Sequence, residues 1–445
     1  MSKDLTQGNV TKTMLLFALP MILGNLLQQF YNIADSFIVG RFLGSGALAA
    51  AGSAYTLMTF LISVITGLCM GSGTVFSVWF GRKDMKELRN SVAVSFVFIG
   101  SVTVIMNLLI FLLTDPILHI LNVPDDIYGL MREYVVIIFG GLFFTFLYNY
   151  FAFLLRATGN SAVPLYFLGI AAVMNIILDI LFVVTFRLGI GGAALATVIA
   201  QGFSGIGLEA YVWFREPSLR PKKDELHITR KNILGVMRHS SAACVQQSVM
   251  NFGILMIQGL VNSFGTAVMA AFAAAVKIDS FAYMPAQEFG NAFSLFISQN
   301  HGCGKTARVK EGVKKAVIVS STFCLLVSAV IFVLAPLMMQ IFISADETEI
   351  IRIGTVYLRT EGSFYIGIGV LFLLYGFYRG IEKPEMSLVL TVISLGTRVL
   401  LAYMTAPLPQ VGVMGIWLAI PIGWILADIT GIVYLKRAFS KSKLC

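Results

Sequence analysis

The chain has 445 residues, of which 57% are hydrophobic and only 12% are charged, and its formal net charge is +9. Soluble domains carry about 25% charged residues, so this composition excludes a water-soluble protein and indicates one that crosses the membrane several times. The basic residues fall in short clusters between apolar runs, as in loops beside an anionic lipid surface, which argues against a nucleic-acid partner.

Twelve apolar runs are long enough to span a bilayer, which takes about 20 residues per helix. Six of them lie in the first half of the chain, near residues 14–39, 47–80, 91–113, 134–155, 164–184 and 193–214. Six more lie near residues 240–262, 267–298, 316–334, 355–377, 387–406 and 415–435. We therefore predict an all-α polytopic membrane protein with twelve transmembrane helices.

The loops between these runs alternate in charge. Lysine and arginine cluster at the start of the chain, after every second run and at the end of the chain. Two of the other loops carry acids instead, namely Asp115, Asp125, Asp126, Asp346, Glu347 and Glu349. Positively charged loops remain on the cytoplasmic side, so the pattern predicts a protein of the cell (cytoplasmic) membrane with both termini inside.

The two halves of the chain resemble each other. The stretch LGSGALAA around Gly44 is similar to FGTAVMAA around Gly265, at an offset of 265 − 44 = 221 in the numbering. The stretch LGIGGA around Gly189 is similar to VGVMGI around Gly412, at an offset of 412 − 189 = 223. This near-constant spacing indicates a duplication. Because six spans return the chain to the same side, the copies are parallel and related by a pseudo-two-fold axis along the membrane normal.

We therefore predict two six-helix lobes with a cavity between them. The polar stretch between the halves contains two prolines and is typical of a linker. The predicted domains are an N-terminal lobe of residues 1–215, a cytoplasmic linker of residues 216–235 and a C-terminal lobe of residues 236–445.

Two aspartates interrupt the apolar runs of the first half. Asp35 lies near the end of the first run. No charged residue lies between Lys12 and Asp35. Asp179 lies in the fifth run, and Asn175, four residues earlier, shares its helix face. An ionised carboxylate inside a membrane costs about 3 kcal/mol on insertion scales, so such residues usually have a function. The alternative for Asp35 is a helix cap at the outer interface, near Arg41.

The duplication gives a contrast between the two copies. At the repeat spacing, Asp35 corresponds to Met256 (256 − 35 = 221) and Asp179 to Ala402 (402 − 179 = 223). If the acids had a structural task, the second copy would need them too. The sequence therefore predicts a cation site in the N-terminal half alone.

The chemistry of this predicted site leaves two coupling ions open. Two buried carboxylates side by side do not both ionise cheaply, so the pair suits the uptake and release of a proton. The same oxygens, with the Asn175 carbonyl and the Thr197 hydroxyl, equally suit a small hard cation such as Na⁺. We expect no other metal and no cofactor beyond the coupling ion.

Several motifs resemble those of the multidrug and toxic compound extrusion (MATE) transporters, over essentially the whole chain. They are LP at 19–20, YNIAD at 31–35, LGSGALAA at 43–50, LRATG at 155–159, NIILD at 175–179 and GAALAT at 192–197. The resemblance is closest to the DinF-like and MepA-like group. It implies a two-lobed, V-shaped fold that exports cationic or amphipathic small molecules in exchange for inward H⁺ or Na⁺. It also implies cation-coupling roles for Asp35, Asn175, Asp179 and Thr197.

Polar residues in the other apolar runs are candidates for lining the substrate cavity. They are Gln28, Tyr31 and Asn32 in the first run and Lys277, Asp279, Glu288 and Arg398 in the second half. Local charge pairing is the alternative for Lys277 and Glu288. NorM-like relatives use acids of the C-terminal lobe, and at matching regions this chain offers only Glu361.

Two other functions are less favoured. A flippase of lipid-linked or polysaccharide cargo, from the same broad superfamily, is the alternative transporter, although larger cargo favours a more cationic cavity and additional spans. An enzyme is disfavoured because the sequence shows no nucleophile–base pair, metal-ligand spacing or phosphate-binding loop. We expect small-molecule substrates, the lipid bilayer as surroundings and a monomer.

Overall fold

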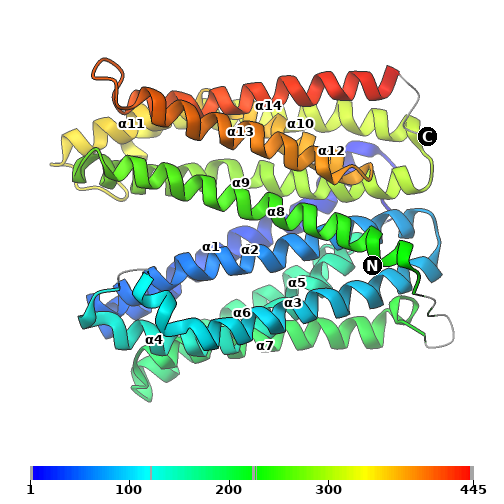
Figure 1. Ribbon diagram of the computed structural model, residues 1–445, viewed down its shortest axis with the longest axis horizontal. Coiled ribbons are helices and arrows are strands. Elements are labelled where there is room, and N and C mark those ends of the chain that lie inside the picture. The colour runs from blue at the N-terminus through cyan, green and yellow to red at the C-terminus, as the bar shows by residue number, and fades with distance from the viewer. Residues whose placement is uncertain (1–3, 121–122, 223–225, 227, 441–445) are drawn as a thin grey trace. The chain divides into compact units, whose positions relative to one another are not determined.

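The structure, a computed structural model, describes residues 4–120, 123–222, 226 and 228–440. All the regular structure in these residues is helical (Figure 1). The chain separates into two compact units. Unit 1 contains Leu23–Cys244, and unit 2 contains Leu5–Ile22 and the described part of Val245–Cys445.

The division between the units falls inside two helices. Helix α1 (Val10–Leu43) begins in unit 2 and ends in unit 1, whereas α8 (Arg230–Asn262) begins in unit 1 and ends in unit 2. The other helices before residue 216 lie in unit 1, and those after residue 265 lie in unit 2. The first helix of each repeat therefore belongs to both units.

Unit 1 is a bundle in which two helices hold the others together. Helix α2 packs against α3, α4 and α5, and α7 packs against α4, α5 and α6. Large apolar side chains fill the space between them, including Phe76, Phe139, Phe146 and Tyr150. The helices of this bundle are α2 (Ser45–Gly81), α3 (Met85–Ile120), α4 (Asp125–Gly140), α5 (Leu142–Ala157), α6 (Ala162–Asp179) and α7 (Gly189–Arg215).

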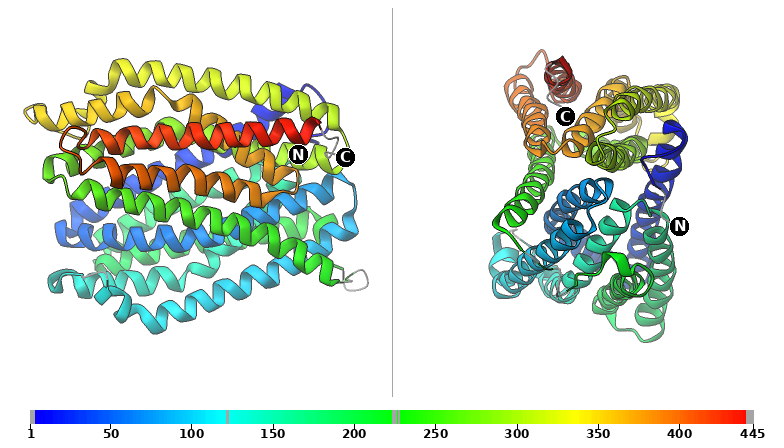
Figure 2. Two further views of the ribbon diagram at one scale, coloured as in Figure 1. Left: turned by 45° about the horizontal axis from the view of Figure 1, so that its top comes forward. Right: turned by 90° about the vertical axis from the view of Figure 1, so that its right-hand side faces the viewer.

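Unit 2 repeats this arrangement with its own helices. Helix α9 packs against α10, α11 and α12, and α14 packs against α11, α12 and α13. Within each unit the long helices run alongside one another (Figure 2). The helices of unit 2 are α9 (Thr266–Gly302), α10 (Thr306–Met339), α11 (Thr348–Gly362), α12 (Tyr365–Gly380), α13 (Pro384–Thr405) and α14 (Met414–Ser440). The recurrence of the same packing confirms the duplicated all-α fold.

The described helices are consistent with twelve membrane spans. Ten are long and apolar enough to cross a bilayer singly, and two helix pairs each make one further span. The pairs are α4 with α5, bent by 44°, and α11 with α12, bent by 51°. The sequence predicts each pair as one unbroken apolar run and gives no sign of the bend. Both bends follow a glycine that ends the first helix, Gly140 and Gly362, and these two glycines are related by the repeat offset (362 − 140 = 222).

Small residues let α8 approach α2 closely within unit 1. A Cβ atom added to Gly67 would lie 2.6 Å from the Cα of Cys244, so only glycine fits there. One turn further, the hydroxyls of Ser72 and Ser240 share a hydrogen bond of 2.7 Å. Close helix packing at small residues, with a hydroxyl pair between the helices, is a common means of association in membranes.

Candidate functional site

The polar residues predicted for the cation site come together inside unit 1. Helix α1 supplies Tyr31 and Asp35, one turn apart and on one face. Helix α6 supplies Asn175 and Asp179 in the same way, and α7 supplies Thr197. Asn175 and Asp179 are fully buried, and Thr197 is 4% exposed.

The carboxyl groups of Asp35 and Asp179 lie within hydrogen-bonding reach of each other. One oxygen of each, Oδ1, is shielded from solvent and has no hydrogen-bond partner among the described residues. Two carboxylates in contact repel each other strongly in a medium of low dielectric constant. The pair is therefore incomplete without a proton or another small cation.

Asn175 joins Asp179 to helix α7. With its amide nitrogen facing Asp179, Asn175 donates to Oδ2 at 3.0 Å, and its amide oxygen accepts from the backbone N–H of Thr197 at 3.3 Å. In the opposite orientation the nitrogen faces the Thr197 hydroxyl, also at 3.3 Å, and the donation to Asp179 is lost. The first orientation satisfies both ends of a buried amide, so we assign it.

Two tyrosines complete the surroundings of the acids. The hydroxyl of Tyr31 is within hydrogen-bonding reach of Thr197. Tyr134, on α4, is buried and lies near both aspartates and Tyr31. Sequence reasoning missed Tyr134. No pattern in the sequence singled it out, because a tyrosine is ordinary in an apolar helix.

The helix that carries Asp179 changes its winding just after that residue. Helix α6 ends at Asp179 and continues as a π-helical turn, Ile180–Thr185. The matching helix of unit 2, α13, stays α-helical to Thr405. Single π-helical turns are rare and occur often at functional sites. Unit 1 therefore differs from unit 2 in backbone as well as in its acids.

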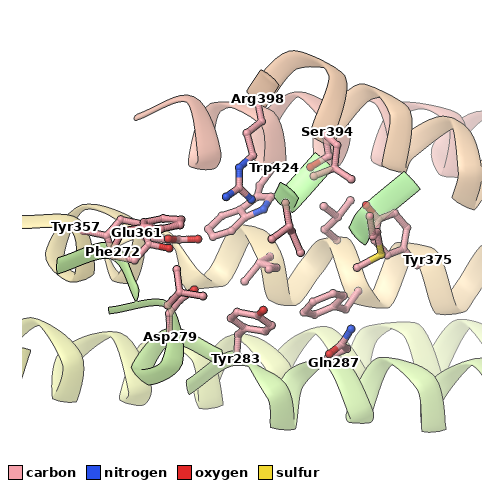
Figure 3. Close-up of a pocket in the computed structure, with 17 residues that line it drawn as sticks. Phe272, Asp279, Tyr283, Gln287, Tyr357, Glu361, Tyr375, Ser394, Arg398 and Trp424 are labelled. Carbon is pink, nitrogen blue, oxygen red and sulfur yellow. The ribbon is translucent and has the colours of Figure 1, made fainter. Parts of the chain in front are cut away.

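Unit 2 contains a different cavity, of about 110 Å³, lined by aromatic and aliphatic side chains and a few charged ones. Asp279 from α9, Glu361 from α11 and Arg398 from α13 all line it. Figure 3 shows Arg398 reaching from α13 towards Glu361 and Trp424, with Asp279 and Tyr283 on the opposite side. Tyr365 donates a hydrogen bond to Asp279. Of the residues predicted to line the substrate cavity, Asp279 and Arg398 thus meet here.

The other predicted substrate-cavity residues lie elsewhere. The ammonium group of Lys277 is 5.8 Å from the ring centre of Phe342, and Glu288 accepts a hydrogen bond of 3.3 Å from Asn291. Neither residue lines the cavity of unit 2. On α1, Gln28 is exposed, and the side chain of Asn32 is half-buried one turn before Asp35.

Comparison with known proteins identifies the family. The sequence profile of the family described as MatE matches residues 20–181 and again residues 242–404. The starts of the two matches differ by 242 − 20 = 222 in the numbering, which agrees with the duplication.

Individual relatives agree with this match. A probable multidrug resistance protein of Bacillus subtilis, YpnP, is 33% identical over 397 residues, which cover 88% of this chain and 87% of YpnP. The multidrug export protein MepA of Staphylococcus aureus is 23% identical over 82% of this chain and 80% of its own length. The fold is that of a transporter of the MOP superfamily from Pyrococcus furiosus, with a TM-score of 0.92 at 22% identity, covering 100% of this chain and 99% of that one. The chain therefore belongs to the MatE family of ion-coupled membrane transporters, which are not enzymes.

Proposed function

We propose that this protein exports cationic or amphipathic small molecules, including drugs, in exchange for the inward flow of H⁺ or Na⁺. The contact between Asp35 and Asp179 carries the proposal, because each acid keeps one buried oxygen without a partner among the described residues. The names of YpnP and MepA, which refer to multidrug resistance and export, agree with it.

The coupling step follows from the charge of the acid pair. A positive ion that enters between the carboxylates removes their repulsion and stabilises the arrangement in which α1 lies against α6 and α7. An ion shifts a conformational equilibrium only by its differential affinity for the two states. Export therefore requires that the ion and the substrate favour different arrangements of these helices, or compete for one.

The position of Asn175 favours H⁺ as the coupling ion. Both ends of its amide are engaged, one by Asp179 and the other by the backbone of Thr197. A sodium ion prefers several oxygen ligands, and one of the two lone pairs of this amide oxygen is already engaged. A proton needs only the two carboxylates.

We also propose that the protein works as a monomer in the cell membrane, with both termini in the cytoplasm. The alternation of basic and acidic loops supports this orientation, because positively charged loops are retained on the cytoplasmic side.

The proposal is tested with purified protein in lipid vesicles, by following export of a fluorescent organic cation such as ethidium under separately imposed proton and sodium gradients. We expect a proton gradient alone to drive export. Asp35→Asn and Asp179→Asn should each abolish gradient-driven export, because a single remaining carboxylate has no second one to repel it and no longer needs a cation between the two positions. Gradient-driven export that survives in both variants would refute the role of the pair.

The duplication provides the matched controls. Met256→Leu and Ala402→Ser change the residues of the second copy that correspond to the two acids. Both variants should export as the unaltered protein does. Movement of a lipid-linked sugar, and not of the organic cation, would instead identify a flippase.

A further inference from the structure

A groove formed by α9 and α10 on unit 2 is separate from the cavity around Asp279. Its volume is about 520 Å³, and every side chain that lines it is apolar. None of these side chains lines the other cavity. They come from the stretch 278–282 of α9, from the stretch 323–338 of α10, and from Ile341 and Phe342, which follow α10.

The groove is long and open. Lining residues on α10 share one helix face from Phe323 to Met338, a distance of about 22 Å at 1.5 Å per residue. Leu326 is 64% exposed and Ile341 is 73% exposed, so the groove opens to the surroundings of unit 2. The hydrocarbon core of a bilayer is about 30 Å thick, and α10 is long and apolar enough to cross it. A molecule that fills the groove is therefore elongated and apolar over most of its length.

One positive charge stands at the end of the groove that lies beyond α10. Lys277 directly precedes the lining residue Ile278 and is exposed, and its ammonium group lies 5.8 Å from the ring centre of Phe342. An aromatic ring attracts an ammonium group but does not neutralise it.

Lys277 forms no ion pair within the described part of the chain, although Asp346 and Glu347 follow Phe342 closely in sequence. A charged side chain within a membrane-spanning helix is costly, so it usually has a partner or a task. The missing partner of Lys277 is therefore a negative group from outside the chain.

The repeated fold does not require this lysine. At the repeat spacing the first copy has Thr56 in its place (277 − 221 = 56). Packing of the duplicated helices is thus compatible with an uncharged residue at this position. The charge is particular to unit 2, as is expected of a residue that binds something there.

The arrangement of the groove and the lysine indicates the class of the ligand. Sites for drug-sized molecules have a few polar groups placed along their walls, and the walls of this groove have none. A single charge at the end of an apolar groove matches instead an amphiphile with a negative head and a long apolar chain. Anionic phospholipids have this form, and basic residues of membrane proteins attract their headgroups.

We propose that the groove between α9 and α10 binds an anionic phospholipid, with an acyl chain along α10 and the phosphate group at Lys277. The ammonium group supplies the charge that selects the lipid, and the apolar walls hold the chain. This site is independent of the acid pair of unit 1 and of the cargo.

The test follows photo-crosslinking of lipids to the full chain in nanodiscs of phosphatidylcholine. The probe is phosphatidylglycerol with a diazirine in its acyl chain, and phosphatidylcholine with the same chain is its uncharged match. Mass spectrometry measures the labelling of residues 323–338. We expect phosphatidylglycerol to label this stretch about fivefold more than phosphatidylcholine does, the effect of one basic residue on an anionic headgroup. Equal labelling by the two probes would overturn the proposal, because it would show an ordinary surrounding lipid.

Variants separate the charge from the groove. Lys277→Gln should remove the preference for phosphatidylglycerol, and Lys277→Arg should keep it. Lys314→Gln, which removes an exposed charge of α10 outside the groove, should leave the preference unchanged. A preference that survives in Lys277→Gln would refute the role of this lysine.

A further variant tests whether the chain lies in the groove itself. Ala282→Phe places a ring where the groove is lined by a methyl group, so labelling of residues 323–338 should fall for both probes. Unchanged labelling in this variant would show that the acyl chain lies elsewhere. Displacement of the phosphatidylglycerol probe by ethidium would assign the groove to cargo and would equally overturn the proposal.

Discussion

Asn175 is the residue on which the geometry of the acid pair depends most. It holds Asp179 at one end of its amide and the backbone of Thr197 at the other. The carboxyl group of Asp179 thereby acquires a fixed position relative to α7. Loss of this amide would leave an oxygen of Asp179 without its donor in the interior, at a cost of about 1–3 kcal/mol.

Asn175→Leu should therefore lower the unfolding temperature and slow export, without creating a dependence on Na⁺. Asn107→Leu is a matched control, because Asn107 donates a hydrogen bond of 2.9 Å to the carbonyl of Phe139 in the same unit. Asn107→Leu should lower the unfolding temperature without changing which ion drives export. Thermal unfolding in detergent and export at varied Na⁺ concentration measure both effects. Na⁺-driven export by the unaltered protein that needs a higher Na⁺ concentration in Asn175→Leu would instead identify this amide as a sodium ligand.

At the scale of single residues, the sequence predicted what stands out against an apolar background. Asp35, Asp179 and Asn175 are conspicuous in membrane-spanning runs because their burial is costly. Tyr134 is not conspicuous, since a tyrosine is ordinary in such a helix. The meeting of Asp279 with Glu361 depends on how α9 and α11 pack, and no local pattern encodes that contact.

At the scale of helices, the approach of α8 to α2 leaves no room for a side chain at Gly67. The backbone of Cys244 occupies the space that a side chain at Gly67 would need. Backbone atoms do not move aside as the end of a flexible side chain does. Gly67→Val should lower the free energy of unfolding by about 1–3 kcal/mol, the usual cost of overpacking.

Gly52, in the same helix, serves as the control for Gly67→Val. Nothing lies within 4 Å of a Cβ atom added there. Gly52→Ala should be neutral or stabilise the helix by about 0.5–1 kcal/mol, because alanine loses less backbone freedom on folding. Thermal unfolding of both variants checks the pair of predictions. Equal effects would show that α8 does not depend on this contact.

The existence of the helices could be predicted, but not their irregularities. Apolar runs of about 20 residues identify spans because a bilayer leaves backbone groups no partner outside the helix. The bend at Gly140 and the π-helical turn after Asp179 depend on what packs against those turns. Glycine occurs too often in this chain, 41 times, for any one of them to indicate a bend.

At the scale of the whole molecule, the sequence did not reveal that the two ends of α1, and likewise of α8, belong to different units. The predicted lobes assign each helix to a single lobe, whereas α1 and α8 each belong to both units. Hydropathy reports only that a helix crosses the membrane, and the contacts of its two ends depend on tertiary packing.

The start of α1 is held in unit 2 by hydrogen bonds to its leading peptide. The guanidinium group of Arg308 donates to the carbonyls of Gly8 at 2.7 Å, Gln7 at 2.7 Å and Leu5 at 3.2 Å. Lys305 donates to the carbonyl of Thr6 at 2.7 Å. Positive side chains thus bind the carbonyls of this peptide, and this contact holds the chain just before α1 begins.

Arg308→Ala should free this peptide and loosen the first turn of α1. Hydrogen bonds from charged donors contribute about 1.5–3 kcal/mol each, so amide exchange near the start of α1 should quicken about tenfold or more. Lys314→Ala, which removes an exposed charge from the same helix, should leave that exchange unchanged. Hydrogen–deuterium exchange with mass spectrometry measures both variants. If the start of α1 stays protected in Arg308→Ala, the anchor lies in apolar contacts such as that of the fully buried Leu5, and these backbone hydrogen bonds are dispensable.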